Sequence, residues 1–249
     1  KQKACWISLL LMMVFGLVRT LSLNGDPDST LASGFFIYVM ILGLVMAVFC
    51  SLFIGTEYSD GTLRNKIIAG CSRPSLVLSN FLLCSLAWIA FCFGYWSTAL
   101  TVGRPLFGGL GTSLPILLET AGCTLLVSCS YAALFTLINL LNSNKAVSAI
   151  TCLLTALLLL GQGFDSLSRL NQPERLQIVE GTPEGEFPTA EWIENPAYLN
   201  PQERKVVSFL ADFLPGGQAL QLSWMIGEPA HPQPVLALYA LIQILIFNG

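Results

Sequence analysis

Residues 55–74 read Gly-Thr-Glu-Tyr-Ser-Asp-Gly-Thr-Leu-Arg-Asn-Lys-Ile-Ile-Ala-Gly-Cys-Ser-Arg-Pro, a polar island in an apolar sequence. The runs on either side of it, 35–54 and 76–100, contain no charged residue. About twenty apolar residues are enough to cross the roughly 30 Å hydrocarbon core of a bilayer. We therefore expect two membrane spans joined by a short polar connection.

The island itself has the signals of a short helix. Ser59 or Thr56 can cap its start, and Asp60 then lies in the first turn, where the helix dipole favours negative charge. Gly70 can end this helix, and Ser72 can begin the next one. About ten residues make a helix roughly 15 Å long. It is too short and too charged to span a bilayer, so we expect it at the membrane surface.

The overall composition is that of a polytopic membrane protein. Of 249 residues, 54% are hydrophobic and 11% charged, against about 25% charged in a typical soluble domain. The net charge of −3, without a basic patch, argues against binding to nucleic acid. The eight cysteines lie in or beside apolar segments without zinc-site spacing, and we interpret them as small packing residues.

The apolar segments predict an all-α polytopic membrane protein with six transmembrane helices. A sixth span begins in residues 234–249, and because it is too short to cross, we expect it to be truncated. Tyr95 and Trp96 are expected in an interfacial aromatic belt. The first five spans are expected within 1–164, at 4–23, 34–53, 76–100, 115–141 and 146–164.

Residues 165–233 differ from the rest because they are polar and rich in Pro, Glu and Asn. Within them, the apolar side chains of Glu203–Leu214 gather on one side, which predicts an amphipathic helix. Pro215-Gly216-Gly217 should end it. We expect this segment to lie outside the spans, on the membrane or against the helices.

The distribution of basic residues predicts the orientation, because cytoplasmic loops are enriched in lysine and arginine. A cytoplasmic N-terminus places the 55–74 island in the cytoplasm and the acidic 165–233 segment outside the cell. The basic residues that this orientation gathers in the cytoplasm are Lys1, Lys3, Arg64, Lys66, Arg73 and Lys145.

Two spans carry small polar residues at helical spacing. On the fourth, residues four apart form one narrow seam, which we interpret as a close helix contact in preference to a substrate path: Thr120, Thr124, Ser128, Ala132 and Thr136. On the fifth, four residues form a mildly polar face: Ser148, Thr151, Cys152 and Thr155.

Residues 56–66 closely resemble the segment between the second and third spans of ABC-2 type transporter permeases, and 213–218 resemble the stretch before their last span. The resemblance implies a cytoplasmic coupling helix, at about 56–70, that docks on a separate ATP-hydrolysing subunit. That subunit would bind ATP and Mg, so this chain needs no cofactor. The implied contacts are Glu57, Tyr58, Asp60, Arg64, Asn65, Lys66 and Arg73.

The same resemblance implies an exporter in a bacterial cell (plasma) membrane, in which two permease subunits pair among membrane lipids. In that family the second and fifth spans line the path, which makes Tyr38, Ser148, Thr151, Cys152 and Thr155 the candidates here. So few polar groups offer no replacement for the hydration shell of an ion. They suit an amphipathic or lipid-like cargo, unless this face simply packs against a neighbouring span.

Three alternatives compete with transport. The chain has no Gly-x-x-x-x-Gly-Lys-Ser/Thr, His-Glu-x-x-His or Gly-x-Ser-x-Gly sequence, which makes a membrane enzyme the least favoured of them. A non-transporting scaffold or receptor, whose extracellular acidic segment binds a partner, would need none of these motifs. The polar island could also be an ordinary cytoplasmic loop.

Overall fold

The computed structural model describes residues 2–24, 30–109, 111–142, 144–179, 190–224 and 234–248. In these ranges, five helices are long and apolar enough to cross a membrane, as an all-α polytopic protein requires. The helix α9 (Pro234–Asn248) is apolar but has 15 residues, so the sixth span stays a prediction. The five are α1 (Gln2–Leu23), α2 (Tyr38–Ser59), α4 (Arg73–Phe107), α5 (Leu114–Leu141) and α6 (Lys145–Leu170).

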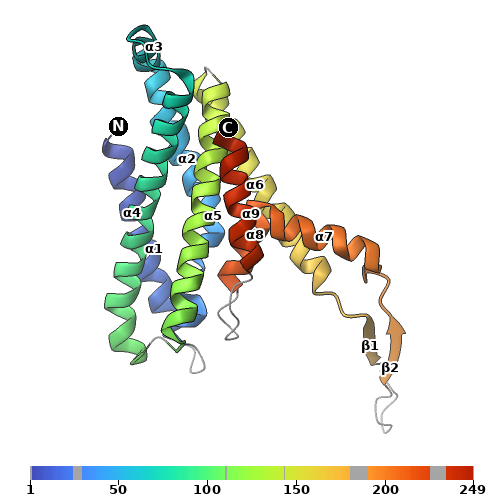
Figure 1. The fold of residues 1–249 in the computed structure, drawn as a ribbon. Coiled ribbons are helices and arrows are strands. Elements are labelled where there is room, and N and C mark those ends of the chain that lie inside the picture. The colour runs from blue at the N-terminus through green and yellow to red at the C-terminus, as the bar shows by residue number, and fades with distance from the viewer. Residues whose placement is uncertain are drawn as a thin grey trace.

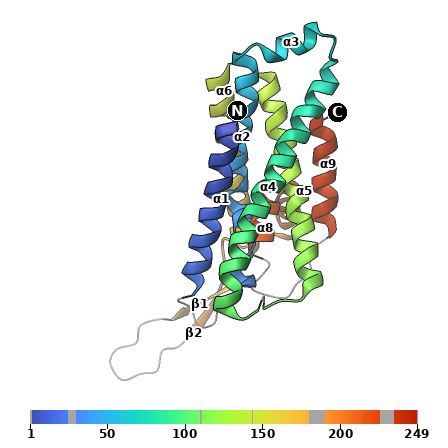
Figure 2. The ribbon, with the colours of Figure 1, turned by 90° about the vertical axis from the view of Figure 1, so that its left-hand side faces the viewer.

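The long helices lie side by side as a bundle (Figures 1 and 2). Helix α1 packs on α4, α2 packs on α5 and α6, and α9 packs on α5. A short 3₁₀ turn, η1 (Ala32–Gly34), precedes α2. The short helix α3 (Thr62–Ile68) lies at one end of the bundle, toward which the N-terminus of α1 and the C-terminus of α9 also point.

The seam of small residues on the fourth span is a packing surface, as predicted. All five of its residues are buried. The hydroxyl of Tyr38 on α2 lies 3.3 Å from Thr124 Oγ1 on α5. Further along the same contact, a Cβ added to Gly43 on α2 would lie 2.9 Å from the ring of Tyr131 on α5. Small side chains on both helices therefore let α2 and α5 approach closely.

The helix predicted over 56–70 is wrong in its boundaries. Nothing in residues 55–59 breaks a helix, so α2 continues to Ser59 and reaches past the predicted end at 53. The break comes at Gly61, whose φ of +67° is a left-handed conformation that glycine adopts without strain. Helix α3 then begins at Thr62, without the side-chain cap expected from Ser59 or Thr56.

The interfacial aromatic belt at Tyr95 and Trp96 stays a prediction. Helix α4 extends beyond the predicted 76–100, which leaves Tyr95 and Trp96 well inside it. Tyr95 is buried, and its ring centroid lies 4.6 Å from that of Tyr38. Trp96 packs on Phe35 with a centroid distance of 6.5 Å. Tyr95 is part of the bundle core, and Trp96 packs against that core partly buried.

The region after the fifth span contains more structure than its polar composition indicated. Helix α6 continues to Leu170. It is followed by an antiparallel hairpin of β1 (Arg175–Val179) and β2 (Ala190–Glu194), which the sequence analysis did not predict. Residues 180–189 and 225–233, which complete the predicted 165–233 segment, lie outside the described residues.

The predicted amphipathic helix is confirmed as α7 (Pro201–Phe213). Asn200 and Glu203 form a capping box at its start, in which each side chain accepts a hydrogen bond from the backbone N–H of the other residue. Figure 1 shows α7 leaving the side of the bundle toward the hairpin.

A further helix, α8 (Pro215–Trp224), was not predicted. Pro215-Gly216-Gly217 ends α7, as expected, but also begins α8, which packs on α2, α5, α6 and α7. A Cβ added to Gly163 on α6 would lie 2.8 Å from the backbone of Gly216. Because neither residue has a Cβ, the two backbones touch. Part of the polar segment is therefore built into the bundle.

Buried glutamine side chains strengthen this arrangement. Gln243 on α9 accepts a hydrogen bond from Ser130 on α5 at 2.6 Å and donates to the carbonyl of Phe213 at the end of α7. Gln218 on α8 donates to the carbonyl of Asp212 at 2.7 Å. Polar contacts thus join α9 to both α5 and α7, and α8 to α7.

The close contact of α6 with α8 predicts a sharp difference between two glycines on α6. Gly163→Ala should lower the free energy of unfolding by about 1–3 kcal/mol, because the new methyl group overpacks the contact. Gly161→Ala is the control, since a Cβ there meets nothing within 4 Å. It should be neutral or stabilising by up to about 1 kcal/mol. Thermal unfolding in detergent measures both, and equal effects would contradict the contact.

Candidate docking surface at the α3 end

The turn between α2 and α3 is fixed by backbone hydrogen bonds. The N–H of Asp60 donates to the carbonyl of Thr56 at 3.0 Å and so completes the last turn of α2. Gly61 then turns the chain, and its carbonyl accepts the N–H of Asn65 at 3.0 Å. After this turn, α3 runs across the end of the bundle from α2 to α4 (Figure 2).

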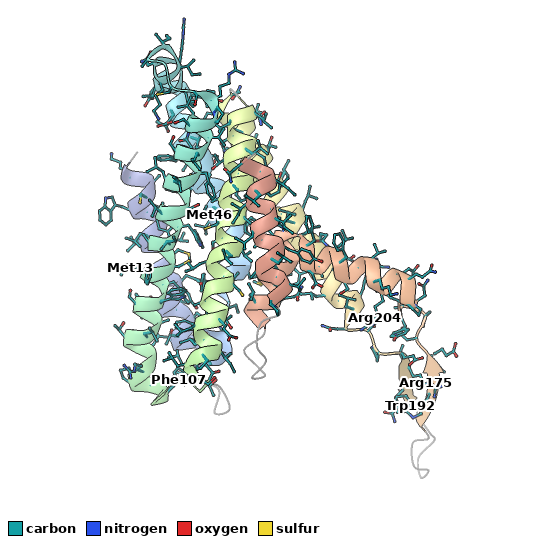
Figure 3. All side chains as sticks on the ribbon, in the orientation of Figure 1. Met13, Met46, Phe107, Arg175, Trp192 and Arg204 are labelled. Carbon is teal, nitrogen blue, oxygen red and sulfur yellow. The ribbon has the colours of Figure 1, made fainter. Side chains whose placement is uncertain are left out.

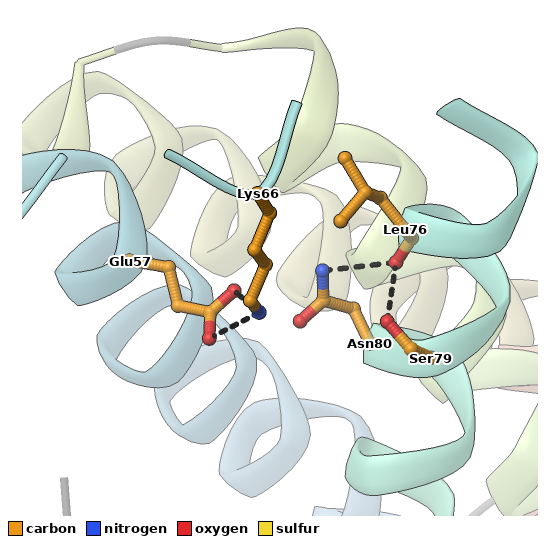
Figure 4. Close-up of polar contacts among 5 residues, drawn as sticks. All are labelled: Glu57, Lys66, Leu76, Ser79 and Asn80. Atoms are coloured by element: carbon orange, nitrogen blue, oxygen red, sulfur yellow. Dashed lines mark hydrogen bonds and ion pairs between the residues drawn. The ribbon is translucent and has the colours of Figure 1, made fainter. Parts of the chain in front are cut away.

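An ion pair holds α3 in this position (Figure 4). Lys66 Nζ lies 3.0 Å from both carboxylate oxygens of Glu57. The side chain of Glu57 is 7% exposed, whereas that of Lys66 is 35% exposed. Low access to water strengthens the attraction between the two charges relative to a surface pair. The pair therefore joins the last turn of α2 to the last turn of α3.

Apolar side chains also lie where α3 meets α4. Leu63 and Leu76 are buried, and a pocket of about 320 Å³ lies beside them, bounded also by Ile67. The hydroxyl of Tyr58 donates to the carbonyl of Leu140 at 2.7 Å. That carbonyl lies in the last turn of α5, where no helical N–H remains to bond it. Helices α2, α3, α4 and α5 thus meet at one point.

The C-terminal end of α3 follows the prediction closely. Gly70 has a φ of +91°, and the N–H of Cys71 donates to the carbonyl of Lys66 at 3.0 Å. Ser72 caps α4 by accepting the N–H of Ser75 at 3.4 Å, with Pro74 in the first turn. The direction of α4 relative to α3 is thereby set.

The residues predicted as partner contacts fall into two groups. Asp60, Arg64, Asn65 and Arg73 are exposed, so they are available to another protein. Glu57, Tyr58 and Lys66 make the internal contacts described above. Beside the exposed polar group, α3 presents two apolar residues that the sequence analysis did not assign to the site: Ile67 (49% exposed) and Ile68 (73% exposed). The free surface is therefore cationic and apolar together.

Two more residues belong to this end of the molecule. Lys145, at the start of α6, donates to Thr56 Oγ1 at 3.3 Å, and its stem lies against Gly55. Asn80 on α4 is buried beside the ion pair and donates to the carbonyl of Leu76 at 3.0 Å (Figure 4). Its Oδ1 has no hydrogen-bond partner within the described ranges. An asparagine inside a span was a signal that sequence reasoning could have used.

The predicted path residues do not form one open polar surface. Ser148 donates to Asn139 Oδ1 at 2.5 Å, and Asn139 Nδ2 lies 3.2 Å from Cys152 Sγ. Tyr38 is buried against α5, as described above. Thr151 and Thr155 remain half-buried on α6. Asn139, which pairs α5 with α6, was not assigned in the sequence analysis.

Over the described parts of the chain, no group of three or more His, Cys, Asp or Glu side chains could hold a metal ion. A protein-family model described as "ABC-2 family transporter protein" matches residues 1–160. No curated protein and no solved structure matches the chain.

The Glu57–Lys66 pair predicts that α3 loosens when the pair is broken. Lys66→Met should speed amide hydrogen exchange throughout α3, because Glu57 loses the partner that holds the helix down. A double-mutant cycle with Glu57→Gln should give a coupling energy of about 1–3 kcal/mol. Arg64→Met is the control, since Arg64 is an exposed cation on the same helix. If the amides of α3 exchange at the same rate in Lys66→Met as in Arg64→Met, the pair does not hold α3.

Proposed function

This chain belongs to the ABC-2 transporter family, and we propose that it is the permease subunit of an ATP-binding cassette exporter. The matched residues, 1–160, include α1 to α5 and most of α6, with α3 among them. The match confirms the resemblance seen in residues 56–66. ABC-2 permeases are non-catalytic membrane components, so we assign ATP and Mg to a separate ATPase subunit.

One observation carries the proposal of coupling. The Glu57–Lys66 pair holds the short helix α3 to the spans. This helix exposes Arg64 and Ile68, and Arg73 is exposed nearby at the start of α4. Charged and apolar residues side by side suit a protein partner, because charge gives orientation and apolar area gives affinity. A helix held at both ends passes a displacement on to α2 and α4. We therefore assign the ATPase contact to this exposed face, with the internal residues in support.

Orientation and assembly follow from this assignment. An ATPase subunit works in the cytoplasm, so the α3 end and the N-terminus are cytoplasmic and the hairpin end is extracellular. The lysine and arginine distribution supports the same orientation. We propose that a second permease subunit, identical or related, completes the path in a bacterial cell membrane.

We place the path along the side of α2 and α6, where Thr151 and Thr155 are the half-buried candidates. Tyr38, Ser148 and Cys152 bond or pack within the subunit, so their role is to shape the wall of the path. A wall with this few polar groups suits an amphipathic cargo and offers an ion no substitute for water.

The docking assignment predicts a strong effect of charge reversal on the exposed face. Arg64→Glu with Arg73→Glu should leave the chain in the membrane and abolish cargo-stimulated ATP hydrolysis by the purified complex, because like charges facing each other cost several kcal/mol. Arg104→Glu is the matched control, since Arg104 is exposed at the opposite end of α4 from Arg73. Stimulation that survives the double reversal would refute docking here. Failure to find any ATPase in the purified complex would favour the scaffold.

The path assignment predicts an effect on transport without an effect on assembly. Thr151→Leu with Thr155→Leu should change transport or cargo selection while the complex forms and basal ATP hydrolysis persists. Thr101→Leu, at an exposed position on α4, is the control. Normal transport by the double variant, or loss of assembly, would identify this face as a packing surface.

A further inference from the structure

A groove of about 720 Å³ lies where the end of α6 meets α7, α8 and α9, outside the part of the chain assigned above. One face of α7 supplies much of its polar lining: Arg204, Ser208 and Asp212, which are spaced one helical turn apart, and Lys205 next to Arg204. Figure 3 shows Arg204 on the side of α7 that faces the end of α6. The α7 side of the groove is therefore polar.

The positive charge is concentrated at the α6 end of the groove. Arg204 Nη2 donates to the carbonyl of Leu170 at 3.0 Å, and its guanidinium lies 5.7 Å from the centre of the Tyr198 ring. These contacts fix the orientation of the group. Its Nη1 is buried and has no hydrogen-bond partner within the described residues. A buried cationic N–H without an acceptor is costly. Because the same guanidinium also lines the groove, with Lys205 beside it, the groove favours an anionic ligand.

The negative charge of the groove is separated from this position. Asp212 lies two turns further along α7, and its Oδ1 accepts Gln221 Nε2 at 3.0 Å. Lys205 is exposed next to Arg204 and adds a second positive charge. An anion at the α6 end would therefore meet two cations.

The remaining wall is apolar and leads to the outer surface of the bundle. The rings of Phe209 and Tyr239 meet edge to face with their centroids 5.9 Å apart. Beyond Tyr239, and on the same face of α9 two turns further along, Ile246 is exposed. In a membrane, such a surface faces acyl chains. A ligand with an anionic head and an apolar tail fits both parts of the groove.

We propose that this groove binds an anionic phospholipid, with its phosphate at Arg204 and Lys205 and an acyl chain along Phe209, Tyr239 and α9. The guanidinium is suited to phosphate because its N–H groups match two oxygens at once. The site stands independently of the transport function, since it needs neither the ATPase nor a second permease.

The test is equilibrium binding of phosphatidylglycerol to the full chain in neutral detergent, measured by native mass spectrometry against phosphatidylcholine with the same acyl chains. One phosphatidylglycerol should bind with clear preference. Arg204→Gln should weaken it about tenfold or more, the usual scale for a lost charge-assisted contact. Lys205→Gln, at an exposed position, should weaken it several-fold without risk to folding. Glycerophosphoglycerol, which has the head without tails, should compete poorly.

The matched control is Arg169→Gln. Arg169 is an exposed arginine at the same end of α6 that faces the other side of α7, with Glu203 and Val206. It should bind phosphatidylglycerol as the unaltered chain does. Equal binding of the two lipids, equal loss in the control, or normal binding by Lys205→Gln and Arg204→Gln would overturn the proposal. Full competition by glycerophosphoglycerol would overturn the lipid assignment, because it would identify a site for a free phosphate.

Discussion

Hydrocarbon offers no hydrogen-bond partner, so the fold depends on buried polar side chains that bond from one helix to the next. Asn139 bonds Ser148 across the α5–α6 contact. Gln243 bonds Ser130 and the backbone at Phe213, which joins α9 to α5 and α7. Each of these side chains would be costly if its partner moved away. The apolar contacts give the bundle its cohesion, whereas these few bonds favour one arrangement of the helices over others.

The sequence predicted the parts of the fold that follow from local chemistry. The seam that includes Thr124 is buried because a four-residue spacing fixes which side chains share a face. Ser72 caps α4, and a charged amphipathic stretch forms α7. Helix α8 was missed because Gly216 signals both the end of a helix and a place for close approach. The distinction requires knowing that Gly163 lies opposite, which is a tertiary fact.

The candidate site was predictable in composition but not in geometry. Arg64 and Arg73 lie on the surface, as charged residues outside a membrane usually do. Glu57 faces inward because α2 continues past 53 and Gly61 then turns Lys66 back toward it. Nine residues separate this pair in the chain, so helical spacing alone does not reveal it. Long-range pairing of this kind becomes visible once the turn is known.

The length of α4 determines how the protein fits its membrane. No charged residue lies between Arg73 and Arg104, and the helix between them is about 46 Å long, which exceeds the roughly 30 Å hydrocarbon core. The excess at its ends carries hydroxyl side chains such as Ser75 and Thr101, which tolerate either water or headgroups. Bilayers of different thickness can therefore surround α4 without drawing an arginine into hydrocarbon, so hydrophobic mismatch costs this helix little.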